Sequence, residues 1–462
     1  MKKNERNIDE KFASASIEEF GYKQELKRSL GLAGIIAYGL AVMAPMAPAA
    51  VFGFVARESH GLVPLVYFIG ITGMVFTAAG YAHMGRRFPI AGSVYNYVQR
   101  GLNPHLGFIA GWLIMIDYFL IPAACVNLTG TWSADLLPAI PPWIFILVSV
   151  IIFTFVNIRG IESATKLNFI LVGLQFVLFG VFLVCVIRYL AAGGGMGFSI
   201  KPFYQPGVID LKFIALAATL ACFSFIGFDS VSTLGEEARN PARDIPRATL
   251  LCLGILGVMF ITMTWLAACV VPDYTTLDPD MGFFNVCGII GGPILRVSTI
   301  LTLLTANLVC SVATQASVTR IMYSFSRDKF FPRFFGVIHP KYKSPWLGIL
   351  FCGTCTAILS IFVNIENLLT LVNFGALTAY LFLNFTVFWY FFIRLKRRGV
   401  HGIINYLFVP VIGFSILAFI WMGFDRITLT FGLSWLAIGI VWGAVKSKGY
   451  KEVPEAFKNT AI

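Results

Sequence analysis

The sequence predicts an all-α integral membrane protein with twelve transmembrane helices, the first ten of which form a five-plus-five inverted repeat. Of the 462 residues, 58% are hydrophobic and 13% are charged, about half the charged fraction of an ordinary soluble domain. Apolar runs long enough to span a bilayer recur along the whole chain. Two of these runs, five spans apart, are interrupted near their middles, which is typical of a binding site inside a membrane transporter.

The spans divide the chain into a core, an added helix pair and two tails. The run from 30 to 55 is too long for the core of a signal peptide, so we expect it to remain as the first helix. The expected organisation is a cytoplasmic tail over 1–29, helices 1–10 over 30–392 with repeats at 30–188 and 213–392, helices 11 and 12 over 405–445, and a cytoplasmic tail over 446–462. The expected spans are 30–55, 62–82, 105–131, 143–158, 166–187, 213–235, 249–271, 291–318, 346–363, 368–392, 405–423 and 429–445.

The distribution of positive charge supports this count and gives the orientation. With both termini on one side, 29 of the 35 Lys and Arg residues fall on that side, which the positive-inside rule assigns to the cytoplasm. We therefore expect a multi-pass protein of the plasma (inner) membrane with both termini cytoplasmic. The net charge of +12 is not gathered into a basic stripe with interleaved aromatic residues, so no nucleic-acid partner is expected. The residues that remain on the other side are Arg57, Arg188, Lys201, Lys212, Arg296 and Arg426.

The interruptions lie in helices 1 and 6. Helix 1 contains the sequence Ala44-Pro45-Met46-Ala47-Pro48, and each proline removes a helical hydrogen bond. Helix 6 contains Phe223-Ser224-Phe225-Ile226-Gly227-Phe228-Asp229, which places a polar group, a glycine and a carboxylate near mid-membrane. Because five is odd, the second set of five helices runs inverted relative to the first. The alternative is two kinked helices without a binding role, since Pro and Gly are common in membrane spans.

Two acids lie at membrane depth, Asp117 in helix 3 and Asp229 in helix 6. A carboxylate at that depth is expensive, so each is a candidate counter-ion for a substrate amine or a site that takes up a proton. The alternative for each is a structural acid that caps unwound backbone or bonds to a neighbouring Tyr or Trp.

The interrupted helices also offer backbone groups to a ligand. Half-helix N-termini suit a carboxylate and half-helix C-termini suit an ammonium, so a zwitterionic amino acid fits both. A polyamine would instead need acids and aromatic faces, which Phe223, Phe225 and Phe228 could supply unless they face lipid.

Further mid-span polar residues are candidates for coupling or gating, although such residues more often join helices together. No cofactor is expected. No metal site is expected either, because the nine cysteines are scattered through apolar runs and the five histidines fall in predicted loops. The coupling or gating candidates are Tyr118, Gln175, Glu236, Glu237, Asn307, Gln315 and Asn373.

Three stretches resemble the amino acid–polyamine–organocation (APC) family: 223–247, 86–95 with Gly111-Trp112, and 334–340 after Arg327-Asp328. The resemblance covers essentially the whole chain and implies the LeuT-like fold of that family, with alternating access and proton coupling or exchange. Within the family the chain looks most like putrescine importers.

Two departures from that pattern bear on the substrate. Ala50 stands where the resemblance to those importers implies an acid in helix 1, and its absence favours an amino acid or a monoamine over a dication. Gln175 stands where some proton-coupled members place a lysine, which puts that coupling device in doubt.

The expected function is secondary active import of an amino acid, or of a polyamine or small amine such as putrescine, by symport with H+ or by antiport. Competing hypotheses are a channel and a transporter-like sensor without turnover, although no polar stripe or ring of like residues is visible. An intramembrane enzyme is not expected, because no nucleophile–base pair lies within the spans.

Overall fold

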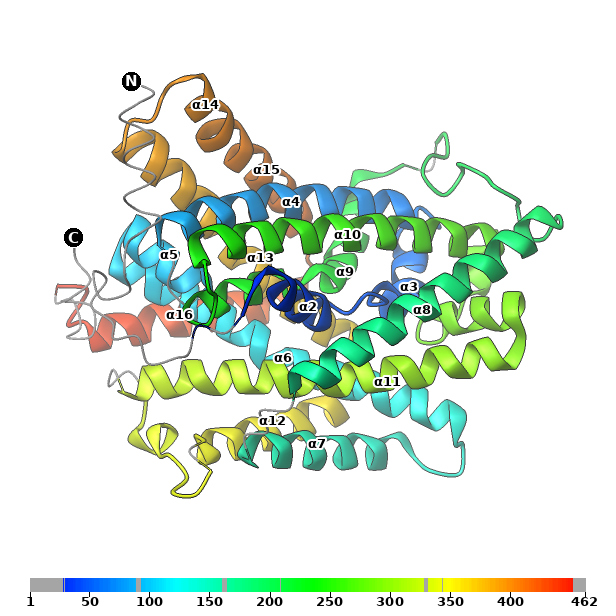
Figure 1. Ribbon diagram of the computed structural model, residues 1–462, viewed down its shortest axis with the longest axis horizontal. Coiled ribbons are helices and arrows are strands. Elements are labelled where there is room, and N and C mark those ends of the chain that lie inside the picture. The colour runs from blue at the N-terminus through cyan, green and yellow to red at the C-terminus, as the bar shows by residue number, and fades with distance from the viewer. Residues whose placement is uncertain are drawn as a thin grey trace.

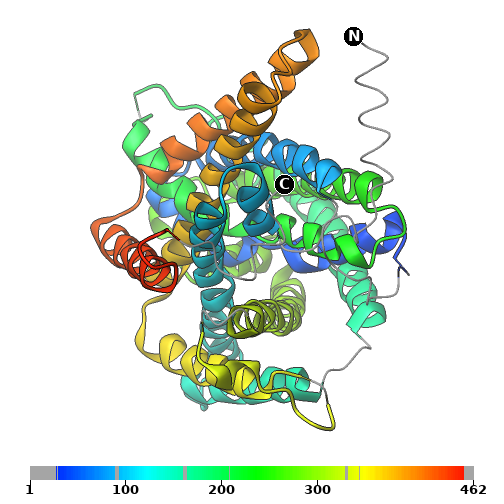
Figure 2. The ribbon, with the colours of Figure 1, turned by 90° about the vertical axis from the view of Figure 1, so that its left-hand side faces the viewer.

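The chain forms a bundle of long helices whose axes run roughly along one direction, with α6 at its centre (Figures 1 and 2). The structure, a computed structural model, describes residues 28, 30–88, 93–159, 164–207, 209–327, 331–342 and 344–451. The predicted tails lie mostly outside the described residues, as does the side chain of Glu236.

The first half of the bundle runs from α2 to α8. Proline opens α3, α4, α6 and α7 in their first turns, where its missing N–H has no helical partner to lose. The helices are α2 (Leu32–Met43), α3 (Pro48–Glu58), α4 (Val63–Arg87), α5 (Ser93–Gly101), α6 (Pro104–Leu136), α7 (Pro142–Arg159) and α8 (Ala164–Ala191).

The second half begins with the segmented helix α9–η2–η3 and ends with α16. Inside α11, Gly292 has a φ of 69° and is followed by Pro293, so the helix kinks at that point. The helices are α9 (Leu211–Ala221), η2 (Cys222–Phe225), η3 (Phe228–Glu236), α10 (Pro241–Val270), α11 (Gly282–Arg327), α12 (Trp346–Phe362), α13 (Ile365–Val387), α15 (Val409–Trp421) and α16 (Arg426–Lys446). Short helical turns are η4 (Tyr274–Thr276), η5 (Arg333–Gly336), η6 (Phe388–Arg394), α14 (Val400–Ile403) and η7 (Ile404–Phe408).

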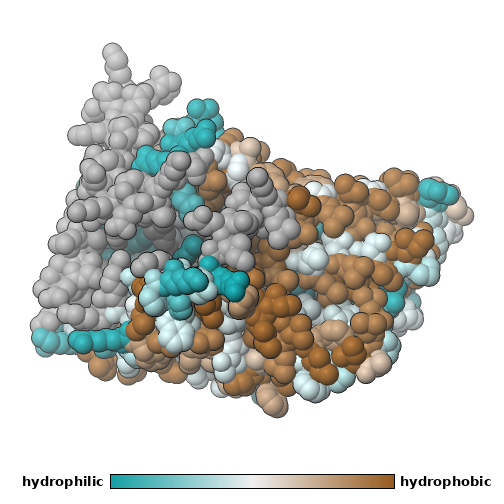
Figure 3. All heavy atoms as spheres, turned by 60° about the horizontal axis from the view of Figure 1, so that its bottom comes forward, coloured by the Kyte–Doolittle hydropathy of each residue, from teal (hydrophilic) through white to brown (hydrophobic). Residues whose placement is uncertain are grey.

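The predicted all-α membrane fold is confirmed. Ten helices among the described residues are long and apolar enough to cross a membrane, or eleven when the bent pair α2 and α3 counts as one span, and α12 is a shorter apolar helix. The count of twelve stays a prediction. Large apolar side chains cover much of the outside, among them Ile151, Ile170 and Ile294, and Figure 3 shows a broad hydrophobic surface with hydrophilic residues toward its ends.

The packing puts α6 and α13 in the interior and α7 and α16 at the rim. α6 contacts α5, α11 and α13 and is buried along most of its length, while α4 and α10 pack along each other. The segment between α4 and α6, expected to be a loop, instead contains α5, because Val94, Tyr97 and Val98 form one buried face. This unexpected helix brings Ser93 toward the centre of the bundle.

Candidate functional site

The interruption in helix 1 lies between α2 and α3. α2 ends at Met43, α3 begins at Pro48, and their axes are bent by 47°. Ala44 holds a φ of 53°, which is unusual for a residue other than glycine. The two prolines prevent the intervening turn from joining a continuous helix.

The backbone of this interruption is internally satisfied. Every residue from 44 to 50 either donates its N–H to an acceptor or is a proline without one. The acceptor for Met46 is the side-chain Oε1 of Gln175, 3.3 Å away on α8. Since no N–H is left over, this stretch offers no ready donor to a ligand carboxylate. The other acceptors are Leu40 O for Ala44, Ala44 O for Ala47, Met46 O for Ala49 and Ala47 O for Ala50.

The interruption in helix 6 is made differently. α9 passes into the 3₁₀ turn η2, and Gly227 then takes a φ of 104° before η3 begins. A Cβ added to Gly227 would lie 2.8 Å from Cγ1 of Val42 in α2. Only glycine permits both this dihedral and this approach, so the two interruptions pack against each other.

A cavity of about 50 Å³ lies between the two interruptions, α6 and α11. It has room for a few water molecules but not for an amine or an amino acid, so binding of such a ligand requires the helices to separate. Of the sequence-predicted residues, it is lined by Ala44, Ala47, Tyr118, Phe223, Ile226, Gly227 and Asn307. The lining residues that sequence reasoning missed are Val42, Met43, Ala50, Ile121, Cys125, Leu303, Ala306, Cys310 and Thr314.

A regular spacing could have revealed the missed side of the cavity. Leu303, Asn307, Cys310 and Thr314 recur at intervals of three or four along α11, so they share one helix face. On a membrane helix, polar residues that share one face indicate an interior surface.

Asp229 is fully buried at the start of η3 and accepts three hydrogen bonds from hydroxyl groups. Tyr118 donates to Oδ2 at 2.8 Å, Ser93 to Oδ2 at 3.1 Å, and Tyr380 to Oδ1 at 3.1 Å. The N-terminal position on η3 also favours a negative charge. Because its partners come from α5, α6 and α13, Asp229 ties the second half of helix 6 to three other helices.

Asp117 is equally buried but lacks such support. Neither of its carboxylate oxygens has a hydrogen-bond partner among the residues that the structure describes. Asp117 itself does not line the cavity, but its neighbour Tyr118 does. A buried carboxylate without a donor requires a cation or a proton to neutralise it.

The remaining predicted aromatic and hydroxyl groups of helix 6 turn away from the cavity. Ser224 shares a hydrogen bond of 2.8 Å with the Tyr67 hydroxyl on α4, and Phe225 packs against Tyr67. Phe228 packs against the ring of Tyr380, whose hydroxyl donates to Asp229. Pro45, Met46 and Pro48 are also absent from the cavity wall.

The predicted mid-span amides join helices. Asn307 donates to the Cys125 carbonyl on α6 while also lining the cavity. Asn373 donates to the Thr219 carbonyl on α9 at 2.6 Å. Gln315 lies away from the cavity, between α11, α7 and α12, where it contacts Asn157, Thr154 and the Ile349 carbonyl.

At one end of the bundle, the backbone ahead of α2 pairs with the backbone after η3. Leu30 donates to the Glu237 carbonyl at 3.0 Å, and Arg239 donates to the Leu30 carbonyl at 2.9 Å. Within the described residues no ion pair joins Glu237 to the arginines that follow it. The Glu237 contact with helix 1 is therefore made by its main chain.

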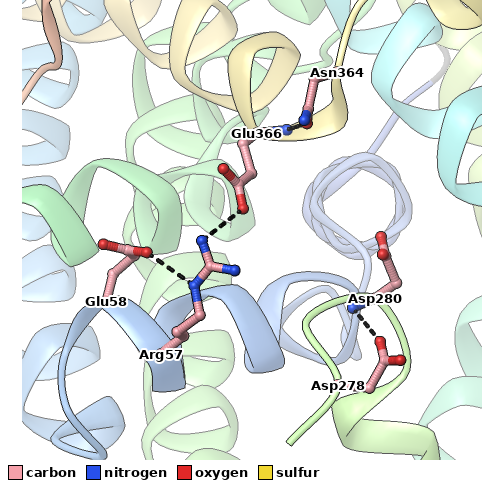
Figure 4. Close-up of polar contacts among 6 residues, drawn as sticks. All are labelled: Arg57, Glu58, Asp278, Asp280, Asn364 and Glu366. Atoms are coloured by element: carbon pink, nitrogen blue, oxygen red, sulfur yellow. Dashed lines mark hydrogen bonds and ion pairs between the residues drawn. The ribbon is translucent and has the colours of Figure 1, made fainter. Parts of the chain in front are cut away.

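At the opposite end, an ion pair joins α3 to α13. Arg57 at the end of α3 contacts Glu366 at the start of α13 at 3.3 Å and Glu58 at 3.2 Å (Figure 4). Nearby, burial and the charges of Asp278 and Glu366 raise the pKa of the Asp280 carboxyl above its ordinary value. The ion pair is more than a third exposed on both sides, so it contributes little stability.

Comparison with known proteins places this arrangement among permeases. Residues 32–449 match the family described as amino acid permease. The low-affinity putrescine importer PlaP of Escherichia coli (strain K12) is 34% identical over 442 residues, covering 95% of this chain and 97% of that protein. The branched-chain amino acid permease BcaP of Bacillus subtilis (strain 168) is 27% identical over 456 residues, covering 91% and 93%.

A solved structure shares the fold. The crystal structure of MhsT in complex with L-phenylalanine superposes with a TM-score of 0.60 at 17% identity, covering 86% of this chain and 100% of that one. At that identity the likeness establishes the architecture alone.

Proposed function

This chain belongs to the amino acid permease family, and from that premise we propose that it is a secondary transporter that imports a small amine. As a member of that family it is a transporter for amino acids or amines and not an enzyme. The proposed location is the plasma (inner) membrane with both termini cytoplasmic, because 29 of the 35 Lys and Arg residues then lie inside.

The unpaired carboxylate of Asp117 carries this proposal. It is buried beside the cavity and has no hydrogen-bond donor among the described residues. The carboxylate of Asp229, in contrast, already accepts hydrogen bonds from three hydroxyl groups. One unsatisfied negative charge matches one ammonium group. The face of Phe223, which lines the cavity, adds an aromatic surface suited to a cation.

The lack of free backbone N–H groups in residues 44–50 favours an amine over an amino acid as the substrate. An amino acid brings a carboxylate that needs donors, but residues 44–50 have none to spare. The first turn of η3 already carries the carboxylate of Asp229, which repels the carboxylate of a ligand. The 34% identical relative is named as a putrescine importer, which agrees with an amine substrate.

The mechanism we propose is alternating access around the two interruptions, coupled to protons or to exchange. Opening must separate α2–α3 and α9–η3 from α6 and α11, because the 50 Å³ cavity is smaller than any such substrate. One side-chain hydrogen bond, from the Met46 N–H to Gln175, joins the turn between α2 and α3 to another helix, whereas three such bonds hold Asp229, so we expect this turn to rearrange more readily.

Purified protein in proteoliposomes tests the function. We expect saturable counterflow of putrescine or a monoamine, weaker counterflow of leucine, and loss of the amine signal in Asp117→Asn. The matched control is Asp273→Asn, an exposed acid whose cap on Thr275 asparagine can keep. Preference for leucine, or unchanged amine transport in Asp117→Asn, would contradict the proposal.

The same preparation separates the competing functions. Flux without counterflow would indicate a channel, and a raised melting temperature with amines but no flux would indicate a sensor. Uptake that does not respond to an imposed pH gradient would exclude proton coupling.

A further inference from the structure

A second cavity, apart from the central one, opens at the rim of the bundle between α6, α12, α16 and the turn η5. Its volume is about 480 Å³, and every residue that lines it is apolar. It shares no lining residue with the cavity between the interrupted helices. Volumes of this size are typical of sites that hold a small molecule.

Two of the three tryptophans that line the cleft bond to each other's backbone carbonyls. The indole N–H of Trp112 donates to the Trp435 carbonyl at 2.9 Å, and that of Trp435 donates to the Trp112 carbonyl at 3.0 Å. Their rings stack with centroids 4.6 Å apart. This reciprocal pair joins α6 to α16 and leaves only hydrocarbon and ring surface toward the cleft.

The cleft extends from one end of the bundle toward its middle. Along α16 the lining residues run from Trp435 to Trp442, seven residues or about 10 Å of helix. Phe335 of η5 lines one end of the cleft, and Ile438, which is 54% exposed, lies where the side wall meets the outside of the bundle. A membrane helix exposed on this face meets lipid, so lipid chains have direct access to the cleft.

Positive charge gathers at the end of the cleft. The Lys446 ammonium lies 5.2 Å from the centroid of the Trp442 ring, and Arg333 is exposed on η5 between two lining residues. Neither α16 nor the stretch 331–363 contains an Asp or Glu. The mouth is therefore basic on both sides, which complements an anionic headgroup.

We infer that this cleft binds one acyl chain of an anionic phospholipid, with the lipid phosphate facing Lys446 and Arg333. A polypeptide partner would bring backbone polar groups that an all-apolar wall cannot satisfy, whereas an acyl chain has none. The basic mouth selects an anionic over a zwitterionic headgroup. Met115 and Phe119 of α6 line the cleft, so the bound chain packs against the helix that also carries Asp117.

Native mass spectrometry of the full-length protein, titrated with phosphatidylglycerol and phosphatidylcholine of identical chains, tests this site. Wild type should bind one phosphatidylglycerol several-fold more tightly than phosphatidylcholine. Ile438→Trp, which blocks the side opening, should weaken both at least tenfold, and Lys446→Gln should remove the preference while keeping phosphatidylcholine binding.

Two control variants make the same kinds of substitution away from the cleft. Ile440→Trp adds the same bulk to an exposed residue of α16 that does not line the cleft, and Arg159→Gln removes a cation that lies over the Phe155 ring on α7. Both should bind lipid as wild type does. Equal affinity for the two lipids in wild type, or unchanged binding in Ile438→Trp, would overturn the inference. The inference would also be overturned if wild type formed a dimer that Ile438→Trp abolished while lipid binding stayed the same. The cleft would then be an interface between two copies of the chain.

Discussion

The interruption between α2 and α3 and the one between α9 and η3 face each other across the same cavity, but their polar groups are satisfied in different ways. In the first, the N–H groups of residues 44–50 bond to nearby main-chain carbonyls, including that of Leu40, and to one side chain of another helix, Gln175. The second depends on a left-handed glycine and on an acid held by three other helices. Movement of the second must therefore break three buried side-chain hydrogen bonds to other helices, whereas one such bond ties residues 44–50 to another helix.

The same contrast separates the two buried acids. Asp229 accepts hydrogen bonds from three other helices, while the equally buried Asp117 has no donor among the described residues. A buried acid near a cavity is therefore not by itself a binding residue, because its hydrogen-bond partners decide its role.

The largest effect is expected at the glycine that lets the two interruptions meet. Gly227→Ala would hold a Cβ 2.8 Å from Val42 Cγ1 at a φ of 104°, so the free energy of unfolding should fall by about 2–4 kcal/mol. Thermal melts and uptake both measure this. Gly254→Ala, on an open face of α10 with nothing within 4 Å, is the control; it should leave uptake unchanged and should not lower the melting temperature.

Asp229→Asn should be the next most damaging. An amide keeps the shape but turns one oxygen into a donor that faces hydroxyl donors, so the loss should be about 2–3 kcal/mol of stability. Tyr380→Phe removes one of the three bonds and should lose about 1 kcal/mol or more. If the stability losses of Asp229→Asn and Tyr380→Phe simply added in the double variant, the result would contradict a direct hydrogen bond between Tyr380 and Asp229.

Asp117→Asn should separate binding from stability. Replacing a buried carboxylate that lacks partners should leave the melting temperature unchanged or raise it. The shift in melting temperature produced by amines should disappear, with affinity at least about tenfold lower. A marked destabilisation in the absence of substrate would make Asp117 a structural residue like Asp229.

Gln175→Ala should have a modest effect on the first interruption. It removes the acceptor for the Met46 N–H and should lower stability by about 1 kcal/mol. Gln175→Glu keeps an oxygen at the same distance and should retain that bond. If both variants melt as wild type does, α2 and α3 hold their bend without α8.

The smallest effect concerns Asp280, which lies just before α11. Because the pKa of Asp280 is raised in the folded protein, its contribution to stability is fully present below the ordinary aspartate pKa and is lost as pH rises through the raised value. Asp280→Asn should therefore flatten the dependence of melting temperature on pH over that window. A wild-type slope in this variant would assign the dependence to other groups.

Much of the fold followed from the sequence because membrane insertion depends on local composition. Runs of apolar residues, charge asymmetry between the loops and the motifs around Gly227 led to the all-α fold and the permease family. The sequence also indicated where proline and glycine interrupt helices 1 and 6, because those residues act through their own backbone.

Only the tertiary structure decided what each polar residue near the interruptions does. Asp117 and Asp229 read alike along the chain, but Ser93, Tyr118 and Tyr380 from three separate helices converge on Asp229 alone. The α11 face at the cavity and the reciprocal pair of Trp112 and Trp435 likewise depend on which helices become neighbours. Local sequence sets helices and their breaks, whereas hydrogen-bond satisfaction is a property of the packed interior.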